Sequence, residues 1–257
     1  MPFVCGGYPG DTGEALLALE RGGAAIAEVG FPFSDPVADG PVIAAAMHRA
    51  LERGITPARV IDQVAAVRPR LSIGVVAMCS ISIIHRLASE RPSPAPDPSR
   101  LFARLAAAGF DGLIVPDVTL EESEPLRLAT AGAGLSFSLL VAPNTPPPRA
   151  AAIARASTGF VYLLAQTGIT GERSEAPNIA PAVAALRAAS SLPIACGFGI
   201  ATPAHVRAVV RSSGPCADAA IVGSALVRRM QDAADEGRDP AAEAERFTRE
   251  LSAGLTP

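Results

Sequence analysis

Short apolar runs that alternate with Ala-, Leu- and Arg-rich helical stretches restrict the fold of this chain more than any other feature. This alternation is typical of βα units that build a parallel sheet. We expect eight strands, at residues 2–5, 24–29, 72–78, 112–115, 136–141, 159–163, 193–196 and 219–222. The expected helices cover residues 12–21, 42–53, 57–67, 100–107, 121–130, 148–156, 180–189, 203–210 and 240–251.

Eight strands with interleaved helices predict an α/β fold that closes into a (β/α)8 TIM barrel, which typically needs about 250 residues. The chain has 257 residues, so we predict one barrel domain over residues 1–257. A doubly wound open sheet is the alternative, but it normally carries a glycine-rich fingerprint after its first strand, and residues 5–10 lack that spacing. The Pro-dense segment 91–98 should be a surface loop, and residues 253–257 should fray.

Composition excludes several classes of function. No window approaches the 18 consecutive apolar residues of a membrane span, and the start has no signal-peptide pattern, so a cytoplasmic protein is expected. A net charge of -3, with no Trp and two Tyr, argues against nucleic-acid binding. All 22 basic residues are Arg, which excludes chemistry through a lysine Schiff base, including covalently bound pyridoxal phosphate.

The histidines and cysteines do not form a metal-binding pattern. The three histidines stand far apart, and the four cysteines lack CxxC spacing. We therefore expect no metal, and we expect the cysteines to be reduced core residues. These residues are His48, His85, His205, Cys5, Cys79, Cys196 and Cys216.

Three carboxylates gather at the end of the second expected strand and in the loop after it. Glu28 interrupts the apolar run 24–30, whereas Asp35 and Asp39 stand on turns built from Pro and Gly. A buried ionised carboxylate is costly, so such a residue is usually paired, protonated or held for proton transfer. The alternative is that Glu28 caps the strand and touches solvent. Together, the three acids favour Glu28 and Asp39 as an acid/base pair.

Glycines follow the last two expected strands. Gly197 and Gly199 come after the seventh strand, and Gly223 and Ser224 lead from the eighth directly into a helix. Helix N-termini and close backbone approach favour an anion, and barrels often bind phosphate at this position. Tight βα turns are the alternative reason for these glycines. The pattern predicts an enzyme that holds a phosphorylated small molecule.

Two further strand-end features allow more than one interpretation. Asp117, after the fourth strand, either supports the site or belongs to a helix start, where acids are favoured. The glycine-punctuated loop 165–174 either closes over a substrate or is an ordinary connection.

These motifs together resemble the alpha subunit of tryptophan synthase over nearly the whole length. They are the block from Glu28 through Phe31-Pro-Phe-Ser-Asp-Pro-Val-Ala-Asp-Gly-Pro41, Pro116-Asp117, Tyr162-Leu-Leu, Gly168-Ile-Thr-Gly171, Gly197-Phe-Gly-Ile200 and Gly223-Ser224. The resemblance implies a carbon–carbon lyase of tryptophan biosynthesis that needs no cofactor. The implied reaction is retro-aldol cleavage of indole-3-glycerol phosphate to indole and glyceraldehyde 3-phosphate. Indole would pass to a pyridoxal-phosphate-bearing beta subunit.

The resemblance also implies roles for individual residues. Glu28 would protonate indole C3 and help deprotonate the glycerol hydroxyl, and Asp39 would accept a hydrogen bond from the indole N–H. Asp35 would contribute to communication with the beta subunit. The implied substrate-binding residues are Tyr162 near Glu28, the lid residue Thr170, and Gly171, Gly199, Gly223 and Ser224 around the phosphate.

The chain departs from the family pattern in three places, of which the changed segment 78–84 concerns docking of the partner. The chain starts at the first expected strand, without the usual N-terminal helix that covers the barrel floor. Residues 78–84 replace a Tyr-Asn-Pro-like stretch that faces the beta subunit, and Gln166 replaces a lid residue that is often Arg. The chain is therefore expected to work with a beta subunit or as a stand-alone indole-releasing lyase. A non-catalytic regulatory partner and another phosphate-handling barrel enzyme, such as an isomerase, are the alternatives.

Overall fold

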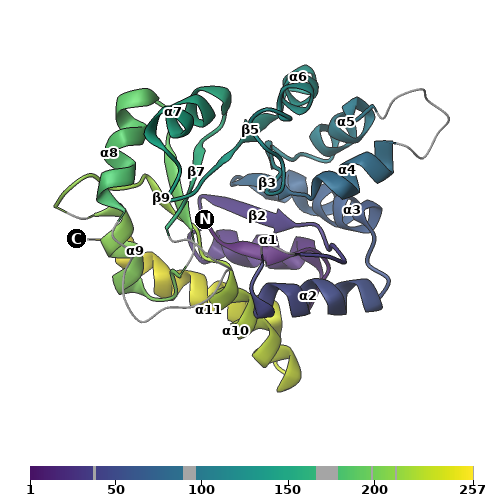
Figure 1. Cartoon of the computed structure of the whole chain (residues 1–257). Coiled ribbons are helices and arrows are strands. Elements are labelled where there is room, and N and C mark those ends of the chain that lie inside the picture. The colour runs from purple at the N-terminus through teal and green to yellow at the C-terminus, as the bar shows by residue number, and fades with distance from the viewer. Residues whose placement is uncertain (37–38, 89–96, 166–178, 198, 212, 257) are drawn as a thin grey trace.

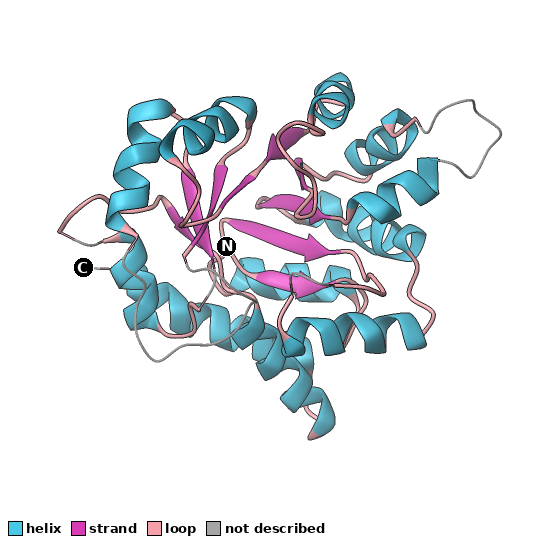
Figure 2. Cartoon of the chain, viewed as in Figure 1, coloured by secondary structure: helices cyan, strands magenta, loops and turns pink. Residues whose placement is uncertain are grey.

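A ring of parallel strands surrounded by helices forms the core of the computed structural model, as Figures 1 and 2 show. The structure describes residues 1–36, 39–88, 97–165, 179–197, 199–211 and 213–256. Most of the Pro-dense segment 91–98 lies outside these residues.

The strands form two parallel sheets. The first contains, in order, β1 (Phe3–Cys5), β2 (Ile26–Gly30), β3 (Gly74–Met78), β4 (Gly112–Ile114) and β5 (Ser136–Ser138). The second contains β6 (Leu140–Val141), β7 (Val161–Leu164), β8 (Ile194–Gly197) and β9 (Ala219–Ala220). All neighbouring pairs are parallel, as expected of βα units.

One seam between the sheets lies at Leu139, the residue that separates β5 from β6. The segment 136–141, expected as one strand, pairs with β4 through its first half and with β7 through its second half. The Leu139 carbonyl accepts from the N–H of Tyr162 at 3.1 Å. One bent strand therefore joins the two sheets.

The other seam lies between β1 and the segment after β9, where Pro2 and Val222 form a parallel bridge. The N–H of Phe3 donates to the Val222 carbonyl at 2.9 Å, and the N–H of Val222 donates to the Met1 carbonyl at 3.1 Å. Joined at both seams, the described strands make the eight-stranded TIM barrel that the sequence predicted.

Helices follow the strands in the expected alternation. They are α1 (Thr12–Arg21), α2 (Pro41–Glu52), α3 (Pro57–Val67), α4 (Ile81–Ala88), α5 (Ser99–Ala107), α6 (Glu124–Gly132), α7 (Pro147–Ala156), α8 (Ala180–Ala189), α9 (Pro203–Val210), α10 (Ser224–Asp235) and α11 (Pro240–Ser252), with 3-10 turns η1 (Arg68–Arg70) and η2 (Ala253–Leu255). Several begin with Pro in the first turn, where its missing N–H costs nothing. Side-chain caps such as Asp11 before α1 satisfy the free N–H groups.

Three expectations about helices were wrong. Helix α4 was not predicted, since none of the expected helices covers residues 81–88. Helix α6 begins at Glu124 instead of residue 121, with Pro125 in its first turn. Residues 253–255 form η2 instead of fraying: Gly254 is buried so closely against α9 that an added Cβ would lie 2.3 Å from the Pro203 carbonyl oxygen.

Two apolar clusters hold the barrel together. The larger lies between the strands and the outer helices. The smaller fills the barrel interior, as side chains from alternate strand positions do in TIM barrels, and its buried members are Val76, Ile114, Phe160, Tyr162, Ala195 and Ile221. None of the helices described is long and apolar enough to cross a membrane.

Candidate active site

Glu28 points into the barrel interior. Ile26 packs against the interior cluster, and Glu28 lies two residues further along β2, on the same face of the strand. Its side chain is 0% exposed, and neither carboxyl oxygen has a hydrogen-bond partner in the described part of the chain. Burial raises the pKa of Glu28 to about 8; the charge of Asp39 adds to the rise and the Met1 amino group opposes it. Glu28 is therefore protonated at neutral pH and is not a solvent-exposed cap.

Asp39 lies half-buried in the loop between β2 and α2, where its N–H donates to the Pro36 carbonyl at 3.0 Å. Burial raises the pKa of Asp39 to about 6. Burial raises the pKa of the Cys5 thiol, at the end of β1, and the charge of Asp39 raises it further. Asp39 thus lies near the carboxyl ends of β1 and β2 and is mostly ionised when Glu28 is still protonated.

Tyr162 approaches the two acids from β7. It is 5% exposed, and burial, followed by the charge of Glu28, raises the pKa of its phenol well above 10. Its hydroxyl extends toward β8, because a Cβ added to Gly197 would lie 2.8 Å from that oxygen. Glycine at position 197 therefore leaves room for a neutral phenol near Glu28.

A small pocket, which we call the strand-end pocket, opens at the carboxyl ends of β2, β3 and β4. Asp39 lines it together with apolar side chains and two further acids. Its lining residues are Phe31, Phe33, Asp35, Pro36, Asp39, Met47, Met78, Ser80, Pro116 and Asp117. Apolar walls with a few polar groups are typical of sites for small organic molecules, but at about 40 Å³ this pocket is much smaller than such sites usually are.

Three of the four residues predicted to hold phosphate, Gly199, Gly223 and Ser224, lie at the ends of β8 and β9. Gly199 has a positive φ of 78°, which favours glycine for its backbone alone. Gly223 precedes α10, and the nearest atom to an added Cβ there is 3.8 Å away, so packing does not demand glycine at this position. Ser224 is the buried first residue of α10. The free N–H groups of this helix start suit an anion.

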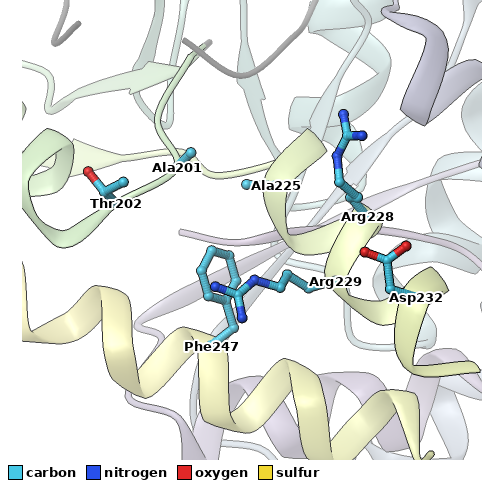
Figure 3. Close-up of a pocket in the computed structure, with 7 residues that line it drawn as sticks. All are labelled: Ala201, Thr202, Ala225, Arg228, Arg229, Asp232 and Phe247. Atoms are coloured by element: carbon cyan, nitrogen blue, oxygen red, sulfur yellow. The ribbon is translucent and has the colours of Figure 1, made fainter. Parts of the chain in front are cut away.

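A hollow of about 430 Å³ lies beside this helix start, on the side of α9 and α11 (Figure 3). Arg229 crosses it from α10, with its guanidinium 4.6 Å from the centre of the Phe247 ring. The remaining lining residues are Ala201, Thr202, Ala225, Arg228 and Asp232. Because Arg229 also pairs with Glu243 and Glu250, its charge here is already compensated.

The family model for the tryptophan synthase alpha chain matches residues 1–256 of this chain. The chain belongs to this family. It is 47% identical over 237 residues to the tryptophan synthase alpha chain of Prochlorococcus marinus (strain MIT 9313), covering 91% of this chain and 82% of the relative. Identity to the chain of Chloroflexus aurantiacus is 41% over 255 residues, covering 98% and 90%.

Solved tryptophan synthase structures share the fold. The enzyme from Mycobacterium tuberculosis matches with a TM-score of 0.83 at 33% identity, covering 99% of this chain and 91% of that chain. The tryptophan synthase A-subunit from Pyrococcus furiosus matches with a TM-score of 0.83 at 28% identity, covering 97% and 96%. The resemblance and the barrel expected from the sequence are confirmed.

Within this tryptophan synthase alpha-chain barrel, the predicted site residues fall into three groups. Glu28, Asp39 and Tyr162 interact electrostatically at the strand ends. Gly199, Gly223 and Ser224 lie at the ends of β8 and β9. Thr170 and Gly171 lie outside the described part of the chain, as does the lid position Gln166, which was not predicted as a site residue.

Several pocket residues were given no role in the site from the sequence. Phe31 and Met78 end or follow strands, so their positions could have been identified from the strand ends. Met47 comes from α2, and nothing in its sequence context indicates a pocket. Asp117 does not begin a helix; it accepts hydrogen bonds from Ser80 and Ile81 in the neighbouring loop.

The described residues contain no group of three or more His, Cys, Asp or Glu side chains that could hold a metal ion. Cys5, Cys79 and Cys196 are buried, as expected, but Cys216 is only partly buried in the loop after α9.

Proposed function

We propose that this chain cleaves indole-3-glycerol phosphate to indole and glyceraldehyde 3-phosphate, the reaction implied by its family. The observation that supports this most is the buried carboxyl of Glu28, which has no hydrogen-bond partner among the described residues and whose pKa of about 8 keeps a proton available at neutral pH. A general acid works best when its pKa lies near the working pH.

In the proposed reaction, the Glu28 carboxyl gives its proton to C3 of the indole ring. Positive charge then develops on the ring nitrogen, and the Asp39 carboxylate, ionised above about pH 6, accepts the hydrogen bond of the indole N–H and stabilises it. The Glu28 carboxylate next takes the proton from the hydroxyl on the glycerol carbon bonded to C3. That carbon–carbon bond breaks, its electron pair returns to the ring, and indole and the aldehyde result.

The phosphate of the substrate is proposed to bind at the other end of the site. Gly199, Gly223 and Ser224 would receive it with backbone N–H groups and the Ser224 hydroxyl, together with Gly171, which lies outside the described residues. The room at Gly223, which packing does not explain, supports close approach of a ligand there.

A beta subunit is the proposed partner, and the cytoplasm is the proposed location of this biosynthetic step. The related Pyrococcus furiosus structure is described as a mutually activating a2b2 complex. The changed segment 78–84 keeps the stand-alone lyase as the second form of the same proposal.

The test is indole release from indole-3-glycerol phosphate by the isolated chain and by the chain mixed with a beta subunit, each compared with Glu28→Gln. We expect turnover that depends on Glu28 in both samples. Equal rates for the unaltered chain and Glu28→Gln would overturn the role of Glu28. No turnover in either sample, together with a change in beta-subunit activity on mixing, would identify the chain as a regulatory partner.

A further inference from the structure

The carboxylate of Asp117 holds the loop after β3. Its Oδ2 accepts from the Ser80 hydroxyl at 2.6 Å, and its Oδ1 accepts from the Ile81 N–H at 2.9 Å. The Ser80 hydroxyl in turn accepts from the Ser82 N–H at 3.1 Å. Two side chains therefore satisfy the first N–H groups of α4, which have no partner within the helix.

This link continues the contact between β3 and β4 beyond the point where strand pairing stops. The last backbone bond described between them runs from the Cys79 N–H to the Ile114 carbonyl at 3.0 Å. Beyond this bond, the side chain of Asp117, which follows β4, accepts hydrogen bonds from Ser80 and Ile81, which follow β3. Losing the Asp117 carboxylate would therefore release Ser80 and Ile81 together.

One of the two released residues, Ser80, lines the strand-end pocket. Met78 and Ser80, on either side of Cys79, line that pocket together with Asp39. Ser80 is 7% exposed, whereas Asp117 is exposed at the rim with both oxygens engaged. Asp117 can thus hold Ser80 in its position in the pocket wall without touching the reacting atoms.

We propose that Asp117, acting through Ser80, is a positioning residue that fixes the pocket wall against which the indole ring binds. This inference rests on the proposed function, which supplies the indole substrate. A carboxylate suits the task because it offers two acceptors on a short side chain, whereas Asn offers one acceptor and one donor group. Asn can keep both contacts only if the Ser80 hydroxyl reverses its role.

The experiment compares Asp117→Ala, Asp117→Asn and Ser80→Ala with one matched control. Ser82→Ala removes a neighbouring exposed hydroxyl, and among the described contacts Ser82 contributes only its backbone N–H. For each variant, kcat and KM for indole-3-glycerol phosphate and Kd for indole propanol phosphate are measured below its unfolding temperature. We expect KM and Kd to rise about tenfold in Asp117→Ala and Ser80→Ala, the effect of about one lost hydrogen bond. Both constants should rise less in Asp117→Asn and stay within about threefold of the unaltered chain in Ser82→Ala, and kcat should stay within about threefold in all four variants.

A second readout follows the loop itself. Cys79 is 3% exposed, so its thiol should react slowly with a thiol reagent in a Cys216→Ser background. Asp117→Ala and Ser80→Ala should expose it and accelerate the reaction, whereas Ser82→Ala should not.

Two results would overturn the proposal. Unchanged KM and Kd with a lowered Tm would show that Asp117 only caps α4, and a loss confined to kcat would place it in the chemistry. If the unaltered chain releases no indole, the proposed function fails. The inference about Asp117 is then tested by whether Kd for indole propanol phosphate rises in the same variants. Absence of analogue binding to the unaltered chain would contradict both.

Discussion

Glu28 and Glu243 are both buried glutamates, but their surroundings are opposite. Glu28 has no hydrogen-bond partner among the described residues, and its pKa is raised to about 8. Glu243 is 5% exposed and pairs with Arg229, Arg238 and Arg246. Burial alone would raise the pKa of Glu243, but the hydrogen bond and charge of Arg246, with the other two arginines, lower it. An unpaired buried acid can move a proton, whereas a paired one stabilises the fold.

The largest expected effect separates the two residues by activity. Glu28→Gln keeps the shape of the side chain but removes its proton transfer, so indole release should fall about 10³-fold. Glu243→Gln should release indole at nearly the unaltered rate when it is assayed below its unfolding temperature. Steady-state rates of both variants provide the measurement, and similar losses in both would break the comparison.

A smaller loss is expected at the neighbouring acid. Asp39→Asn removes the negative charge at the indole N–H, and kcat should fall about 10²-fold. Because the charge of Asp39 also raises the pKa of Glu28, the alkaline limb of the pH profile should move to lower pH in this variant. An unchanged alkaline limb would contradict the coupling between the two acids.

The pH profile of kcat/KM for the unaltered chain should be bell-shaped. Activity should fall about tenfold per unit above pH 8, where Glu28 loses its proton, and similarly below pH 6, where Asp39 gains one. In Asp39→Asn the acid limb should disappear. An acid limb that persists in Asp39→Asn would show that a group other than Asp39 causes it.

The stabilities of the two variants should change in opposite directions. Glu243→Gln leaves three arginines around a neutral side chain and should lose about 2 kcal/mol, less than a fully buried pair because the arginines are half-exposed. Since the folded pKa of Glu243 lies below its ordinary 4.5, this loss should be full above pH 4.5 and fade as pH falls through the folded pKa. Urea unfolding at several pH values measures it.

Glu28→Gln should have the reverse pH dependence. The folded pKa of about 8 lies above the ordinary value of 4.5, so the contribution of Glu28 to stability is fully present below pH 4.5 and is lost as pH rises through about 8. Gln does not titrate, so the variant should match the unaltered chain near pH 4.5 and be more stable near pH 9. A variant that is less stable at both pH values would mean that Glu28 has a structural partner.

The sequence allowed the barrel and two acids of the candidate site to be predicted, because these depend on local patterns. Glu28 was recognisable as the one acid in an apolar strand, and Asp39 followed from its turn. The bend at Leu139 could not be predicted. It results from pairing of the two halves of segment 136–141 with β4 and β7, and the sequence of that segment does not indicate these pairings. Helix α4 was missed because Asp117, a residue far away in the sequence, helps to cap its start.

Glu243 shows the same limit. Its position in α11 resembles that of an exposed helix acid, and the three arginines that bury it come partly from α10 and the turn after it. Only tertiary packing distinguishes the surroundings of Glu243 from those of Glu28. Sequence alone could therefore identify an unusual acid in a strand but not a buried, paired acid in a helix.

The most direct test of the contrast is a ¹³C NMR titration of the glutamate side-chain carboxyls in the unaltered chain, Glu28→Gln and Glu243→Gln. We predict one resonance that titrates near pH 8 in the unaltered chain and in Glu243→Gln, and that is absent from Glu28→Gln. If every glutamate carboxyl of the unaltered chain titrates near its ordinary value or below, Glu28 is ionised at neutral pH and cannot be the proton donor.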